Sequence, residues 1–160
     1  MTREHHYEVT VSWRGNTGTG TSGYRSYERS HDLASAGLPI IEGSADPAFV
    51  GDASRWNPEQ LLLGALSQCH MLSYLALCSL GRVVVVAYED SARGLLHESA
   101  RTRGRFTEVI LAPLVTVASE SMVTEATALH RRAHEVCFIA NSVNFPVRHV
   151  PTIRVPAGHD

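Results

Sequence analysis

The sequence predicts an α+β fold in which the elements follow one another in the order β-β-α-β-β-α-β. Three observations support this order: side chains alternate along residues 6–13, residues 58–80 form a long apolar run, and residues 82–90 contain four consecutive valines. Strands and helices do not alternate one by one, which argues against a parallel doubly wound sheet. With 160 residues, the chain is long enough for its own core, and we expect one domain over residues 1–160.

The first third of the chain predicts two strands followed by a loop. A turn is expected at residues 15–23, which are rich in Gly, Thr and Ser, and a second strand at residues 22–33. Residues 37–56 contain two prolines and three glycines and predict a loop. The alternation in residues 6–13 is typical of a half-buried strand, and its apolar members are Tyr7, Val9, Val11 and Trp13.

A long helix is expected from residue 58 to residue 80. Asn57 is a good N-cap because its side chain can accept a hydrogen bond from a free backbone N–H, and Pro58 suits the first helical position. Gln60 completes the spacing of a capping box, and Gly81 is a natural stop. Because the run is apolar on nearly every side, we expect this helix to be buried rather than amphipathic.

Composition and charge argue against several kinds of partner. The helix is long enough to span a membrane, but Ser67, Gln68 and His70 fall at its middle, where polar groups are unfavourable in lipid, so we expect no membrane. A net charge of −2 gives no basis for binding nucleic acid. All fourteen basic residues are Arg, which excludes a lysine nucleophile. Three cysteines without a signal peptide suit a reducing cytosol, and we expect a cytoplasmic protein.

The second half of the chain predicts three strand segments and one more helix. The valine-rich residues 82–90 strongly favour a strand. Residues 106–117 form the next strand, which Pro113 interrupts and therefore marks as an edge or a bulge. A second helix is expected from residue 119 to about residue 136, and residues 146–155 fit a closing strand.

Two cysteines are candidates for chemistry. Cys69 lies in the middle of the first helix and could be either a small buried apolar residue or a reactive thiol. His130, His134 and Cys137 are spaced i, i+4, i+7 and share one face of the second helix. Cys78 is nine residues from Cys69, about half a turn away around the helix, so we interpret it as a core residue.

The sequence Asn-Pro-Glu-Gln at residues 57–60 leads into the apolar helix with Cys69, and Cys-Phe-Ile-Ala-Asn-Ser follows at residues 137–142. This pairing resembles the OsmC/Ohr family of thiol-dependent peroxidases, which reduce organic hydroperoxides. The resemblance extends from about Tyr7 to Val155. It implies an OsmC-like fold, with antiparallel sheets wrapped around central helices in an intertwined homodimer.

The resemblance also implies an activity and its residues. Cys69 would be the peroxidatic cysteine and Cys137 the resolving one, joined through an intramolecular disulfide. A dithiol reductant, lipoyl-type or a small thiol, would regenerate the enzyme, and no cofactor or metal is implied. Arg29 matches the family's active-site arginine, with Arg25 as the alternative, and Glu59 matches its partner acid.

The position of Glu59 on the helix restricts its role. Glu59 precedes Cys69 by ten residues, which is about 15 Å along a helix axis. It cannot touch the Cys69 of its own helix, so a catalytic Glu59 must come from another subunit. Otherwise Glu59 is a first-turn acid that the helix dipole favours.

The histidines near the two cysteines leave two alternatives to a peroxidase open. His70 directly follows Cys69 where family members often have an aromatic residue. Zinc could be held by Cys69, His130, His134 and Cys137, or the protein could bind a small molecule without catalysis. His134, and with it His130, could instead be a helix C-terminal cation that interacts with the last carbonyls.

Overall fold

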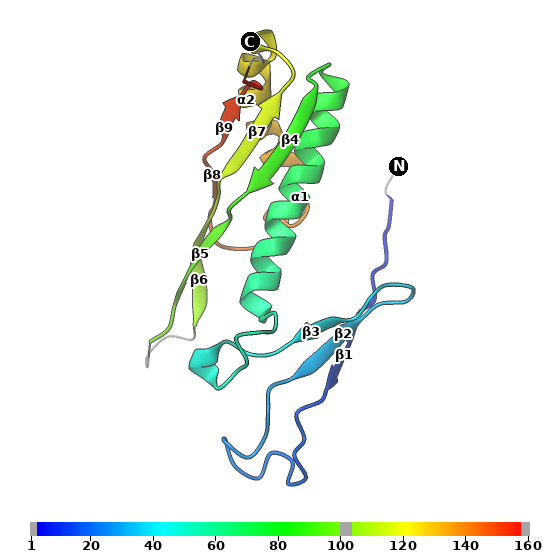
Figure 1. Ribbon diagram of the computed structural model, residues 1–160, viewed down its shortest axis with the longest axis vertical. Coiled ribbons are helices and arrows are strands. Elements are labelled where there is room, and N and C mark those ends of the chain that lie inside the picture. The colour runs from blue at the N-terminus through cyan, green and yellow to red at the C-terminus, as the bar shows by residue number, and fades with distance from the viewer. Residues whose placement is uncertain (1–2, 100–103, 158–160) are drawn as a thin grey trace. The chain divides into compact units, whose positions relative to one another are not determined.

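The computed structural model describes residues 3–99 and 104–157 of the chain. The chain divides into two compact units, unit 1 (Met1–Leu61) and unit 2 (Leu62–Asp160). Figure 1 shows the sheet of unit 1 and the strands and helices of unit 2. The prediction of one domain over residues 1–160 stays a prediction.

Unit 1 contains an antiparallel sheet in the order β1–β2–β3. Its strands are β1 (Thr10–Trp13), β2 (His31–Ala34) and β3 (Ile41–Gly43), and a short 3₁₀ helix, η1 (Pro47–Phe49), follows. The prediction of a strand from residue 22 is wrong for residues 22–30, where turns such as the Ser26 N–H to Gly23 carbonyl bond take its place. The loop expected at residues 37–56 contains β3, whose three residues are too short for a periodic signal.

The apolar side of the first strand lies on the surface. Tyr7 is 89% exposed and Trp13 is 45% exposed, and Val9 and Val11 are exposed as well. In the single chain the apolar side of this strand is exposed, so the prediction of a half-buried strand is wrong. The alternation marks an apolar surface rather than a core face.

Helix α1 (Pro58–Leu80) has the predicted bounds and start. The Gln60 N–H donates to Asn57 Oδ1 at 2.8 Å, and the Asn57 N–H donates to Gln60 Oε1 at 3.2 Å, so both bonds of the capping box form. At the other end, the left-handed position is Arg82 (φ 59°) rather than Gly81, and the Val83 N–H closes the turn on the Cys78 carbonyl at 2.9 Å.

The expectation that α1 is buried all around is wrong. Its buried residues form a single stripe with a spacing of four, whereas Leu72 is 60% exposed and Leu80 is 83% exposed. By length and composition α1 could cross a membrane, a property that core helices of soluble proteins share. The polar residues at its middle are used within the fold, because Ser67 bonds Asp90 and His70 bonds His130. The buried stripe consists of Leu66, His70, Tyr74 and Cys78.

Unit 2 contains two three-stranded sheets. One has the order β4 (Val85–Asp90), β7 (Pro113–Val117), β9 (Thr152–Arg154), and the other has β5 (Arg93–His97), β6 (Arg105–Leu111), β8 (Val147–His149). The pairs β4–β7 and β5–β6 are antiparallel as expected, and β8 and β9 add in parallel. The predicted closing strand is thus two strands that enter different sheets, and the predicted strand around Pro113 divides into β6 and β7.

The second helix, α2 (Val123–Val136), follows a short 3₁₀ turn, η2 (Glu120–Met122), and ends before another, η3 (Ala140–Ser142). Figure 1 shows α1 running alongside the β4–β7–β9 sheet. A core cluster joins Tyr74 and Cys78 of α1 to Val115 and Val117 of β7 and to Ala133 of α2. The α+β prediction is confirmed, and Cys78 is a core residue as predicted.

Candidate active site

Two thiols meet where α1 and the end of α2 approach each other in unit 2. Cys69 lies on α1 and is partly exposed, whereas Cys137 follows the last residue of α2 and is 1% exposed. The Cys69 side chain lies close enough to that of Cys137 to change its pKa, and both cysteines are free. The fold therefore brings together the two cysteines that the sequence singled out.

The two thiols have different environments. Burial, together with the neighbouring Cys69 side chain, raises the pKa of Cys137 to about 11, although the backbone N–H groups of Ala140 and Ile139 act in the opposite direction. Cys137 is therefore a protonated thiol at neutral pH. A protonated thiol can donate, so its S–H is available to the sulfur of Cys69.

Contacts between α1 and α2 continue beyond the thiols. His70 Nε2 and His130 Nδ1 are 3.0 Å apart, and the Tyr74 ring stacks on the His130 ring with centroids 3.9 Å apart. The Tyr74 hydroxyl also donates to the Ala126 carbonyl at 3.1 Å. From Cys69 to Tyr74 the residue numbers on α1 increase, while those of the contacting residues on α2 and directly after it decrease from Cys137 to Ala126. The two helices are therefore antiparallel.

Four imidazoles lie against one another in this region and are named here the histidine cluster. The His149 ring of β8 lies 5.6 Å from the His70 ring, 6.3 Å from the His130 ring and 5.5 Å from the His134 ring, measured between centroids. The cluster comprises His70, His130, His134 and His149, and so it joins three elements: α1, α2 and β8.

The central imidazoles are neutral at physiological pH. Burial, with help from the neighbouring His149 and His134, lowers the pKa of His70 to about 4. Burial lowers the pKa of His130 to about 3, again with help from neighbouring histidines. The idea of His130 as a helix C-terminal cation is therefore wrong, because no charge is retained at a fully buried imidazole. His134 lies in the last turn of α2, where such a residue was expected.

The zinc alternative finds no support in the geometry. Among residues 3–99 and 104–157, no group of three or more His, Cys, Asp or Glu side chains is arranged to hold a metal ion. His70 and His130 use one ring nitrogen each for their mutual bond. Within the described part of the chain, three buried ring nitrogens have no hydrogen-bond partner: His70 Nδ1, His130 Nε2 and His134 Nδ1.

Arg29 is held firmly within unit 1. Its guanidinium donates to the carbonyls of Tyr27 and Tyr24, and it lies 4.1 Å and 4.6 Å from the centroids of the two rings. Arg25, the alternative, is exposed. The role assigned to Arg29 by resemblance stays a prediction, as does that of Glu59, which lies half-buried in the first turn of α1.

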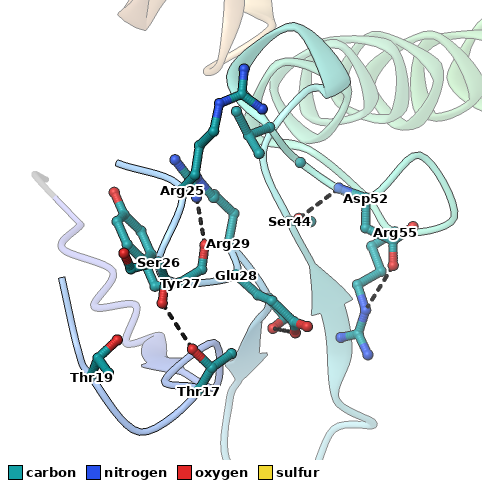
Figure 2. Close-up of a pocket in the computed structure, with 13 residues that line it drawn as sticks. Thr17, Thr19, Arg25, Ser26, Tyr27, Glu28, Arg29, Ser44, Asp52 and Arg55 are labelled. Atoms are coloured by element: carbon teal, nitrogen blue, oxygen red, sulfur yellow. Dashed lines mark hydrogen bonds and ion pairs between the residues drawn. The ribbon is translucent and has the colours of Figure 1, made fainter. Parts of the chain in front are cut away.

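Arg29 also lines an open pocket of unit 1 with a volume of about 750 Å³ (Figure 2). The Thr17 hydroxyl donates to the Ser26 carbonyl at 2.8 Å on one side, and Arg55 pairs with Asp52 at 3.7 Å on the other. The wall is mixed in charge, because the guanidiniums of Arg25, Arg29 and Arg55 share it with the carboxylates of Glu28 and Asp52.

Two contacts near the thiols could not be found from the sequence. His149 lies in a three-residue strand with no motif around it. Asp90 ends the valine-rich strand, where its carboxylate accepts from the Ser67 hydroxyl at 2.6 Å and from the Ala112 N–H at 2.7 Å. A polar residue at the end of an apolar strand is the one weak signal for such a role.

Comparisons with known proteins agree with the fold. The model of the OsmC-like protein family matches residues 51–150. The structure of an OsmC-like protein of unknown function from Vibrio cholerae is 30% identical, with a TM-score of 0.84 over 93% of this chain and 100% of that chain. No curated protein sequence matches significantly.

More distant structures share the fold. An organic hydroperoxide resistance protein from Elizabethkingia anophelis is 16% identical, with a TM-score of 0.67 over 96% of this chain and 100% of that chain. The organic hydroperoxide resistance protein OsmC from Legionella pneumophila is 17% identical, with a TM-score of 0.64 over 95% of this chain and 100% of that chain. Since the family model covers more than half of the sequence, the protein belongs to the OsmC/Ohr family.

Proposed function

We propose that the protein is a thiol peroxidase that reduces organic hydroperoxides to alcohols. The observation that carries the proposal is the proximity of Cys69 and Cys137, one thiol partly exposed and the other buried. Membership of a family that includes organic hydroperoxide resistance proteins supports the same chemistry.

In the first step, the thiolate of Cys69 attacks the peroxide O–O bond. The O–O bond breaks, a sulfenic acid forms on Cys69, and the alkoxide takes a proton and leaves as the alcohol. Cys69 suits this role because it is the more accessible thiol of the pair. The sulfur is oxidised by two electrons, and the hydroperoxide accepts them.

In the second step, Cys137 attacks the sulfur of the sulfenic acid. The S–S bond forms, the S–O bond breaks, and the thiol proton of Cys137 leaves with the hydroxide as water. A dithiol reductant, lipoyl-type or a small thiol, then exchanges with the disulfide and restores both thiols. The buried, protonated state of Cys137 suits a residue that reacts only after Cys69 has been oxidised.

Arg29 would favour the thiolate of Cys69, and Glu59 would orient that arginine. Because Glu59 lies ten residues before Cys69 on the same helix, this arrangement needs a homodimer in which Glu59 comes from the partner. The exposed apolar side chains of residues 7–13 and of Leu72 support such a dimer. We propose a homodimer on this basis, and the free cysteines support the proposal of a cytoplasmic location.

The test is a count of free thiols before and after one equivalent of cumene hydroperoxide, with mass mapping of the product. We expect the loss of two thiols and a Cys69–Cys137 link, with no reaction in Cys69→Ser. Intact thiols after treatment would remove the peroxidase assignment. A non-catalytic binding protein would retain ligand binding in Cys69→Ser without any turnover in the native chain.

A further inference from the structure

The contact that follows the thiol pair along α1 is a hydrogen bond between two buried imidazoles. His70 is the residue after Cys69, and His130 lies seven residues before Cys137 on α2. Their Nε2 and Nδ1 atoms are 3.0 Å apart, and their side chains are 1% and 0% exposed. This His70–His130 pair therefore joins the two helices that carry the reacting sulfurs.

The pair is rotationally restrained. The two imidazole planes are within 9° of each other, and the Tyr74 ring covers His130 at an interplanar angle of 12°. A rotation of either ring would break the hydrogen bond and the stacking together. A restrained contact of this kind fixes how far α2 can slide along α1, and Cys137 follows directly from the end of α2.

The His70–His130 pair is also less favourable in the core than apolar side chains would be. Among the residues that the structure describes, the buried atoms His70 Nδ1 and His130 Nε2 have no hydrogen-bond partner, and burial of an unpaired polar atom is unfavourable. In either tautomeric arrangement one of these atoms is an N–H and the other a lone pair, so neither arrangement satisfies both. Two apolar side chains of similar size would avoid this cost. The imidazoles therefore contribute less to stability than apolar side chains of similar size would.

We propose that the His70–His130 pair positions Cys137 against Cys69 and thereby sets the rate of disulfide closure. This inference rests on the proposed two-cysteine mechanism. Closure requires the Cys137 sulfur to approach the Cys69 sulfur in line with the breaking S–O bond. The first oxidation requires only Cys69 and the hydroperoxide, so the pair leaves that step unaffected.

The experiment separates the two steps in variants of His130. In His130→Leu the side chain has a similar size but cannot form the hydrogen bond to His70. In His130→Asn the side-chain amide keeps a polar atom close to the position of Nδ1. After one equivalent of cumene hydroperoxide, trapping with a dimedone probe gives the rate of sulfenic acid formation, and mass analysis gives the rate of closure. A matched control is His97→Leu, at an exposed histidine of β5.

We expect His130→Leu to slow closure by about 10- to 100-fold, as misplacement of reacting atoms commonly does, with sulfenic acid formation unchanged. His130→Asn should recover most of the closure rate, and His97→Leu should match the native chain. Equal slowing of both steps, or no slowing of closure, would overturn the proposal. If His130→Leu does not fold, His130→Phe, which keeps the stacking on Tyr74, is measured against the same two outcomes.

The variant Tyr74→Phe distinguishes an effect on folding stability from an effect on the position of Cys137. It loses the hydrogen bond to the Ala126 carbonyl but keeps the histidine pair. It should unfold more easily in urea and still close its disulfide at the native rate. The thiol oxidant diamide closes the disulfide without a peroxide. If the native chain does not react with hydroperoxides, the proposed function fails, and diamide closure rates of the same variants still decide whether His130 positions Cys137.

Discussion

The side chain of Cys69 lies close enough to that of Cys137 to affect its protonation although the two residues stand 68 positions apart in the sequence. One of them is partly exposed on α1, and the other is buried with its pKa raised to about 11. The third cysteine, Cys78, is buried in the core on another side of α1. The three cysteines are therefore chemically distinct, and single substitutions can assign them separately.

Substitution of Cys137 should stop the reaction after its first step. Cys137→Ser keeps a hydrogen-bond donor but cannot form a disulfide, so a sulfenic acid should accumulate on Cys69. Mass analysis after dimedone trapping measures this. Cys78→Ala is the matched control, because it removes a cysteine outside the pair and should leave disulfide closure at the native rate. Closure through Cys78 in the Cys137→Ser variant would contradict the assignment.

Folding stability should fall as the pH drops below about 6.5. Unfolded histidines take up protons near that pH, whereas burial lowers the pKa of His70 to about 4 and of His130 to about 3. In this window the unfolded state binds more protons than the folded state, so the free energy of unfolding decreases by up to about 2.7 kcal/mol per pH unit.

Urea unfolding at several pH values between 7.5 and 4.5 measures this slope. The pKa of His149 is lowered by burial as well, so His130→Asn removes one of three such histidines and should make the slope shallower, whereas His97→Asn should leave it unchanged. Stability that is constant from about pH 6.5 to 5 would mean that the buried imidazoles are not held neutral.

The capping box of α1 should contribute measurably to stability. Asn57→Ala removes the acceptor of the 2.8 Å bond from the Gln60 N–H and should cost about 1 kcal/mol in the free energy of unfolding. Asn57→Ser can restore a cap and should recover most of that loss. Equal urea midpoints for the Ala and Ser variants would show that the cap is not the reason for the effect.

A glycine at residue 82 should stabilise the protein. Arg82 has a φ of 59°, a left-handed conformation that is unfavourable for a residue with a Cβ atom. Arg82→Gly should therefore raise the free energy of unfolding by about 1 kcal/mol, measured by urea unfolding. Arg82→Ala also removes the arginine side chain but keeps the Cβ atom, so a gain of the same size in this variant would contradict the conformational explanation.

Local signals in the sequence were sufficient for the helices. The start of α1 depends on Asn57, Pro58 and Gln60, which are adjacent in sequence, and its bounds are predicted correctly. Its exposure is not, because an apolar run does not show which of its sides meets another element. Leu72 is as apolar as Leu66, yet the first is 60% exposed and the second is 0% exposed.

Long-range pairing could not be predicted from local pattern. His70 and His130 are 60 positions apart, and nothing near either residue marks the other as its partner. The strands β8 and β9 have three residues each, too few for an alternation to appear, so one closing strand was expected where two enter different sheets. The pairing of Cys69 with Cys137 was found through the family resemblance, which carries tertiary information that spacing alone lacks.

The carboxylate of Asp90 restricts the rotation of α1 about its own axis. Its two oxygens accept from Ser67 on the helix and from the Ala112 N–H next to β7, so the helix is fixed in rotation about its own axis. Successive residues of a helix differ by about 100° in direction. A turn of that size would present Gln68 or His70 in place of Cys69. Through its bond to Ser67, Asp90 thus helps to determine which of these three consecutive side chains faces Cys137.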